Sequence, residues 1–157
     1  MTQVLSPVSG TAIPMSQVAD EVFAEGLAGE GAAVVPRASG EALAPVSGAL
    51  VKLFEGGHAF GIATDDGAEV LVHLGLDTIE LEGEGFQRLA TEGERVEAGQ
   101  PLVRFDLQAI QDAGYDPTTP VFVSNSDEFA VDGQETGEVR AGDRLFEIAD
   151  VASGATG

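Results

Sequence analysis

The chain has 157 residues, of which 27 are acidic and 7 are basic, giving a formal net charge of −20 at pH 7. This charge argues against a nucleic-acid ligand, because phosphate backbones need many lysine and arginine side chains to replace their counterions. Here the only lysine is Lys52, and six arginines are dispersed along the chain. The same sign of charge opposes docking on an anionic membrane surface.

The composition favours a single folded domain. Hydrophobic residues make up 43% of the chain, and a length near 150 residues suits one core. The chain contains no cysteine, so disulfides and thiolate metal sites are excluded. The N-terminus lacks the basic start and apolar stretch of a signal peptide, and no apolar run reaches the roughly 20 residues of a membrane span. We predict one domain over 1–150, a flexible tail over 151–157 and a cytoplasmic location.

Short apolar and β-branched runs alternate with turn residues along the whole chain, which contains 21 glycines and 7 prolines. This texture is typical of an all-β protein, and we predict a compact antiparallel β-sandwich or flattened barrel. Helices are expected to be few and short, over 16–24 with Ser16 as its cap, over 85–90 and over 107–113. The predicted strands are 31–35, 48–54, 59–63, 69–73, 102–105, 120–123 and 144–148.

Two pairs of similar segments indicate an internal duplication. Pro7-Val-Ser-Gly10 recurs as Pro45-Val-Ser-Gly48, and the pattern Val-x-Ala-Gly occurs in 96–102 and again in 139–145. The separations are unequal, which excludes a regular solenoid repeat. We predict instead a β-turn-β unit that is used twice inside one sheet structure.

An Asp-Gly turn predicts a hairpin that brings the two histidines of the chain together. Asp65-Asp66-Gly67 separates two apolar runs, and Asp-Gly favours the left-handed conformations of a tight hairpin turn. Pairing 59–64 with 69–73 places His73 opposite residue 59, next to His58. A register slip of one residue would reverse the faces of the strand.

His58 and His73 are the only side chains whose ordinary pKa, about 6.5, permits proton exchange or neutral nucleophilicity near pH 7. Two buried, hydrogen-bonded imidazoles with a purely structural role are one interpretation of the pair. A zinc site is another, since His58 and His73 would supply half of a tetrahedral shell. No acidic ligand is marked by its spacing, and neither His-Glu-x-x-His nor His-x-His occurs.

The sequence around His73 resembles the phosphorylation-site signature of the glucose-family enzyme IIA domain (type 1) of the bacterial phosphoenolpyruvate-dependent sugar phosphotransferase system. The resemblance begins with Gly67-Ala-Glu-Val-Leu-Val-His73-Leu-Gly-Leu-Asp-Thr-Ile79 and continues through 80–86. Other blocks match in order, and together they cover roughly 4–149. These blocks are 22–25, 44–48, 54–60, 105–106 and 123–127.

The resemblance implies a phosphocarrier, a phosphotransferase component that acts only with protein partners. His73 would accept a phosphoryl group from the carrier HPr and pass it to a cysteine in the IIB domain of a sugar permease. His58 would lie beside it and stabilise the phosphoryl oxygens. For Nε2 of His73 to be the nucleophile, Nδ1 must carry the proton, and the resemblance implies that the backbone carbonyl of Gly75 accepts it. No cofactor is required.

The resemblance also implies a docking rim around the histidines. Its apolar members are Val22, Phe23, Leu27, Phe54 and Leu71, for which core packing is the alternative explanation. Its acidic members are Asp20, Asp77 and Asp127, for which surface solvation is the alternative. An apolar centre with acidic edges suits a partner with basic residues and would speed encounter more than raise affinity.

Gly56 departs from the family pattern. Relatives commonly carry a hydroxyl residue two places before the first histidine, where it joins the hydrogen-bond network of the site. At this position the present chain has Gly56, so the network must be shorter, use water or borrow another group.

Other function classes fit the residues less well. A biotinyl or lipoyl carrier domain shares the β-turn texture but needs a modifiable lysine on an exposed hairpin, and Lys52 lies in an apolar strand. A zinc peptidase of the lysostaphin type needs more histidines than two. In enteric relatives the unphosphorylated protein also inhibits sugar permeases and glycerol kinase. The motifs do not specify the sugar, and they occur both in free-standing proteins and in domains fused to permeases.

Overall fold

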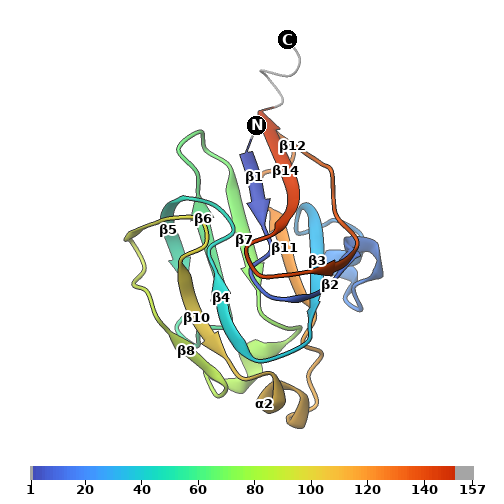
Figure 1. Ribbon diagram of the computed structural model, residues 1–157, viewed down its shortest axis with the longest axis vertical. Helices are drawn as coiled ribbons and strands as arrows, with labels where there is room; N and C mark the ends of the chain where they lie inside the picture. Colours follow the sequence, from blue (N-terminus) through green and yellow to red (C-terminus); the bar gives the residue numbers. More distant parts are fainter. Residues whose placement is uncertain (1, 151–157) are drawn as a thin grey trace.

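The computed structural model describes residues 2–150, without the side chain of Asp150, and consists of antiparallel sheets with few short helices (Figure 1). The predicted tail over 151–157 lies outside the described residues. In chain order the elements are β1 Thr2–Leu5, β2 Gly10–Pro14, η1 Met15–Gln17, α1 Glu21–Ala24, β3 Glu30–Pro36, β4 Gly40–Leu43, β5 Gly48–Leu53, β6 Ala59–Ala63, β7 Glu69–His73, η2 Thr78–Leu81, β8 Phe86–Arg88, β9 Arg95–Val96, β10 Pro101–Phe105, α2 Leu107–Asp112, β11 Thr119–Val123, β12 Phe129–Asp132, β13 Gly137–Val139 and β14 Arg144–Asp150.

The strands form three sheets in which every pairing is antiparallel. The largest has the order β13-β2-β3-β11-β7-β6-β5-β9, and two three-stranded sheets have the orders β4-β10-β8 and β1-β14-β12. All three sheets contribute fully buried side chains to one hydrophobic core, such as Val4, Phe60, Val103 and Phe146. The predicted all-β antiparallel architecture is confirmed. The large sheet is open, with β13 and β9 at its two ends, so the fold is not a closed barrel.

Each of the seven predicted strands is present, but only one of the three predicted helices is. α2 forms where expected, and Asp106 caps it by accepting a hydrogen bond from the Ala109 amide (3.1 Å). The helix predicted over 85–90 is wrong, because its residues form β8, in which Phe86 pairs with Phe105 of β10. Gly85 has a φ of +91°, which directs the chain out of the preceding turn and into this strand.

The helix predicted over 16–24 is wrong in extent and in its cap. The segment contains the 3-10 turn η1 and the one-turn helix α1, which are separated by extended backbone at Val18. Val18 is buried, so its side chain is placed by packing and not by helix propensity. The cap is Asp20 and not Ser16, since an Asp20 carboxylate oxygen accepts from the Val22 amide at 2.9 Å.

The two copies of the duplicated unit contact each other through equivalent hydrogen bonds. The Leu5 amide donates to the Pro45 carbonyl (2.8 Å), and the Leu43 amide donates to the Pro7 carbonyl (2.9 Å). Each Pro-Val-Ser-Gly segment leads into a strand that pairs with a Val-x-Ala-Gly strand. In one copy Gly10 lies opposite Val139, and in the other Gly48 lies opposite Val96. The predicted internal duplication is therefore a local two-fold arrangement of β-turn-β units.

Close backbone contact explains why both units contain glycine at this point. A Cβ atom on Gly10 would lie 1.9 Å from the Val35 carbonyl oxygen, and one on Gly48 would lie 2.1 Å from that of Ala63. Both distances are far below van der Waals contact, and both obstacles are backbone atoms of paired strands. A larger residue at either position requires the strands to separate.

We predict that Gly48→Ala lowers the free energy of unfolding by about 3 kcal/mol or more, because the new methyl group overpacks a sheet that cannot yield locally. Gly40→Ala is the matched control, since Gly40 is exposed on β4 and a Cβ atom there meets nothing within 4 Å. Its effect should stay within about 0.5 kcal/mol. Urea denaturation of both variants measures the difference. Equal stability of the two would contradict the packing explanation.

Candidate functional site

The two histidines meet at the open end of the β6–β7 hairpin. In this hairpin Ala59 pairs with His73, which is the predicted register. The Leu74 amide donates to the His58 carbonyl at 2.6 Å and closes the end of the ladder. The imidazole rings lie 5.4 Å apart between centroids at an interplanar angle of 66°. The convergence predicted from the Asp-Gly turn is confirmed.

A backbone carbonyl fixes the ring of His73. Nδ1 of His73 lies 2.5 Å from the carbonyl oxygen of Gly75, as predicted. A carbonyl oxygen can only accept, so Nδ1 must donate and therefore carries a proton. In the neutral ring, Nε2 then holds the lone pair. The hydrogen bond thus presents Nε2 as the nucleophilic atom.

Glycine is required at position 75 for two reasons. Its φ of +88° lies in the left-handed region, which turns the chain sharply enough for the carbonyl to reach back to His73. A Cβ atom there would also lie 2.5 Å from Cγ2 of Thr78 and 3.2 Å from the carbonyl oxygen of Asp116. The same Asp116 carbonyl accepts from the Leu76 amide (2.8 Å), and the Thr78 hydroxyl donates to the Leu74 carbonyl (2.7 Å). These bonds hold the turn rigid.

His58 is held by packing and not by a hydrogen-bonded carbonyl. Its side chain is only 4% exposed, and its ring contacts that of Phe54 at a centroid distance of 5.0 Å. Among residues 2–150, every fully buried side-chain nitrogen or oxygen has a hydrogen-bond partner. The ring nitrogens of His58 have no such partner in this part of the chain, so they must be accessible to solvent. A Cβ atom on Gly56 would lie 3.3 Å from Nδ1 of His58. A hydroxyl residue at position 56 would therefore reach this nitrogen, and Gly56 leaves it open.

Burial lowers the pKa of both imidazoles and so favours their neutral forms. Desolvation is the main cause that lowers the pKa of His58, and the neighbouring His73 lowers it further. Desolvation also lowers the pKa of His73, although the Gly75 carbonyl and the carboxylates of Asp77 and Asp20 oppose the shift. Because the net pKa shift of His73 is downward, the lone pair of Nε2 is available at neutral pH.

Of the predicted apolar rim, Phe23 and Phe54 contact the histidine rings, and the five members differ in exposure. Phe23 of α1 lies 6.0 Å from the His73 ring and 5.4 Å from the Phe122 ring, between centroids. Leu71 and Phe54 are partly buried. Val22 and Leu27 are 49% and 73% exposed. Exposed apolar side chains beside a reactive group are typical of a surface for protein docking.

The structure brings two of the three predicted acidic rim residues to the site. Asp77 and Asp20 both act electrostatically on His73. Asp127 follows β11 in a loop that contacts the first residue of β7, and its place in the rim stays a prediction. In that loop the Ser124 amide donates to the Glu69 carbonyl (2.9 Å), and Asn125 Nδ2 donates to the Gly67 carbonyl (2.9 Å). The register of β7 with β11 places this loop near the hairpin turn.

One part of the site was not predicted. A pocket of about 440 Å³ opens beside His58, and η2 contributes Ile79, which is 56% exposed, and Glu82 to its wall. The signal in the sequence was Ile79, which with Leu81 is one of two apolar residues among the acidic residues of 77–84. Phe54, Glu55, Gly56 and His58 form the rest of the lining.

The residues around the pair do not form a zinc shell by themselves. No group of three or more histidine, cysteine, aspartate or glutamate side chains in residues 2–150 is arranged to hold a metal ion. His58 and His73 therefore supply two ligands at most from this chain, and zinc would need ligands from elsewhere.

Two further structural findings bear on the other function classes. Lys52 lies within β5, with its ammonium group 5.3 Å from the Phe54 ring centroid, and is not at the tip of a hairpin as a carrier-domain lysine would be. Within the described part of the chain, none of the helices has the length and apolar character needed to cross a membrane.

Comparison with known proteins identifies the family. Residues 2–129 match the family described as phosphoenolpyruvate-dependent sugar phosphotransferase system, EIIA 1, and the chain belongs to it. The chain is 39% identical over 143 residues to the glucose-specific EIIA component of the phosphotransferase system of Haemophilus influenzae. That alignment covers 91% of this chain and 86% of the relative. The sequence resemblance is thereby confirmed.

Two further relatives support the assignment. The chain is 43% identical over 145 residues to the β-glucoside-specific EIIBCA component of the phosphotransferase system of Bacillus subtilis. That alignment covers 92% of this chain but only 24% of the relative. The solved structure of glucose permease IIA from Mycoplasma capricolum superposes with a TM-score of 0.87 at 40% identity. That superposition covers 92% of this chain and 93% of the other. The structural match and the sequence match therefore both assign the chain to the glucose-type EIIA proteins.

We predict that both histidines titrate below the ordinary value of about 6.5 and that neutral His73 carries its proton on Nδ1. Proton–nitrogen correlation spectra of the rings, recorded against pH, measure both properties. In a His73→Gln variant the pKa of His58 should rise toward its ordinary value, because a neighbouring positive charge is removed, yet remain below it because burial persists. A pKa of His73 above 6.5, or a proton on its Nε2, would contradict the site geometry.

Proposed function

We propose that this chain is a phosphocarrier of a sugar phosphotransferase system, in which His73 accepts a phosphoryl group from phospho-HPr and passes it to a cysteine of a permease IIB domain. The observation that carries the proposal is the hydrogen bond from Nδ1 of His73 to the Gly75 carbonyl, which leaves Nε2 as the nucleophile. Membership of the EIIA 1 family supports the reaction class. Names of relatives that join EIIB, EIIC and EIIA in one component support a IIB partner.

The first half-reaction needs little covalent work from the protein. The Nε2 lone pair of His73 forms a bond to phosphorus while the bond from phosphorus to the donor histidine breaks, and the donor nitrogen keeps the electron pair. The Nδ1 proton stays with the ring and remains hydrogen-bonded to Gly75, so the ring charge that develops is stabilised. Positioning and charge compensation therefore dominate this transfer.

His58 has the geometry for a supporting role. Its ring lies 5.4 Å from that of His73, close enough for a nitrogen to approach phosphoryl oxygens carried on Nε2. A dianionic group would also raise the pKa of His58, because a nearby negative charge favours the imidazolium form. His58 thereby becomes a better donor only while the phosphoryl group is present. An arginine would instead be a permanent clamp.

The exposed apolar rim supports docking by protein partners. Phe23 contacts His73, Val22 and Leu27 on the same segment are exposed, and Asp20 and Asp77 add negative charge near His73. HPr and IIB would dock with apolar centres and basic edges on this one surface, so the two partners bind in turn. Residues 2–150 would act as one domain on the cytoplasmic side, where phosphoenolpyruvate is available. The sugar served by the permease is left open.

We predict that incubation with phosphoenolpyruvate, enzyme I and HPr adds one acid-labile phosphoryl group to the protein, because one nitrogen is presented as a nucleophile. His73→Ala should abolish the labelling, whereas Asp66→Asn, at the hairpin turn, should retain it. Intact-mass spectrometry before and after acid treatment measures the modification. Labelling that survives His73→Ala would overturn the assignment.

We further predict that His58→Gln slows transfer to the IIB cysteine more than it slows acceptance from HPr. The reason is that the stabilising donor matters most when the group must approach a thiolate. Rapid-quench measurement of the two half-reactions with purified phospho-proteins separates the effects. A reduction of similar size in both would show that His58 has no preferential role in the second step.

A further inference from the structure

We infer that Asp20 and Asp77 set the phosphoryl-transfer potential of His73, by raising the free energy of the phosphorylated form relative to the unphosphorylated one. The inference rests on the proposed function and deepens it. It assigns to these carboxylates a thermodynamic role that is separate from any contribution to docking.

Both carboxylates are held beside His73 by short, defined pieces of backbone. Asp20 is the cap of α1, and the Phe23 ring of this helix contacts the His73 ring at 6.0 Å between centroids. Asp77 comes two residues after Gly75, whose carbonyl holds Nδ1 of His73. Asp77 has a φ of 59°, a left-handed conformation that is uncommon for a residue other than glycine.

No cation of the described chain neutralises the two carboxylates. The ion pairs within residues 2–150 are formed by Arg37, Arg95, Arg104 and Arg144, and none of them includes Asp20 or Asp77. The Asp20 side chain accepts from the Val22 amide, which leaves its charge in place. Two cations lie on the His58 side of the pair: the Lys52 ammonium lies over the Phe54 ring that contacts His58, and the Arg88 side chain lies beside Gly57.

Transfer to Nε2 adds negative charge to this acidic site. The incoming group has two negative charges, the ring gains one positive charge when Nδ1 keeps its proton, and the net change is one negative unit. Both carboxylates already act electrostatically on the ring, where they oppose the lowering of the His73 pKa by burial. Glu55 and Glu82, in the pocket beside His58, have the same sign as the two aspartates, whereas the cations Lys52 and Arg88 lie on the His58 side of the pair. Repulsion between like charges therefore makes the phosphorylated protein a better donor to a thiolate.

The experiment measures the equilibrium constant for phosphoryl exchange between purified HPr and this protein, at concentrations too low for the complex to accumulate. Docking interactions cancel from this constant, because it depends only on the free proteins. The variants are Asp20→Asn and Asp77→Asn. Asparagine also caps helices well and tolerates the left-handed region, so both substitutions remove charge and preserve the local backbone.

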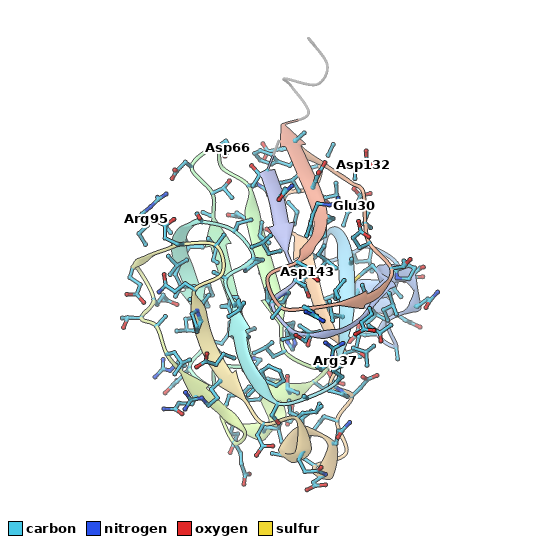
Figure 2. The ribbon with its side chains drawn as sticks, in the orientation of Figure 1. Glu30, Arg37, Asp66, Arg95, Asp132 and Asp143 are labelled. Carbon is cyan, nitrogen blue, oxygen red and sulfur yellow. The ribbon has the colours of Figure 1, made fainter. Side chains whose placement is uncertain are left out.

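We expect each substitution to shift the constant toward the phosphorylated protein by about threefold to tenfold at low ionic strength. The double variant should shift it further, and high salt should compress all of the differences. Asp66→Asn is the matched control, because Asp66 is an exposed aspartate at the far end of the same hairpin (Figure 2). Its constant should stay within about twofold of that of the parent protein.

An unchanged equilibrium constant accompanied by slower transfer in both directions would overturn the inference, because it would show that the carboxylates act in docking alone. A shift toward phospho-HPr would also overturn it. Failure of the parent protein to become phosphorylated on His73 would be a different result, since it would overturn the proposed function itself.

Discussion

The hydrogen bond between Nδ1 of His73 and the Gly75 carbonyl is the interaction on which the site depends. It fixes the ring, selects the tautomer and leaves Nε2 as the reactive atom. The bond exists because Gly75 adopts a left-handed conformation, and neighbouring hydrogen bonds from Leu76 and Thr78 hold that turn in place. The chemistry of a side chain is thus set by a backbone conformation that only glycine adopts at low cost.

Electrostatics around the pair acts in two opposing directions. Burial lowers the pKa of both histidines and favours their neutral forms, whereas Asp20 and Asp77 favour positive charge on His73. A phosphocarrier needs both effects, because its nitrogen must be free to accept the group and must not keep it. The acidic residues behind the net charge of −20 therefore have two roles: a few act on His73, and the many others keep the surface solvated.

Much of the site could be predicted because it is encoded locally. The Asp-Gly turn defines the register of the β6–β7 hairpin, and this register alone brings His58 next to His73. The errors arose where tertiary packing decides. Val18 is buried in extended backbone and so interrupts the helix predicted over 16–24, and Phe86 pairs with Phe105 in a region predicted to be helical. Asp127 was assigned to the rim by sequence similarity alone, because no local pattern in the sequence connects its loop after β11 with His73.

The most direct test of the account is to identify the nitrogen that carries phosphorus. Phosphorus and nitrogen-15 NMR of the phosphorylated, ring-labelled protein distinguishes Nε2 from Nδ1 and His73 from His58. The account predicts a single phosphorus on Nε2 of His73, with the Nδ1 proton still hydrogen-bonded to Gly75. Phosphorus on Nδ1 of His73, or on either nitrogen of His58, would contradict it, because Nδ1 of His73 is already occupied by the bond to the carbonyl.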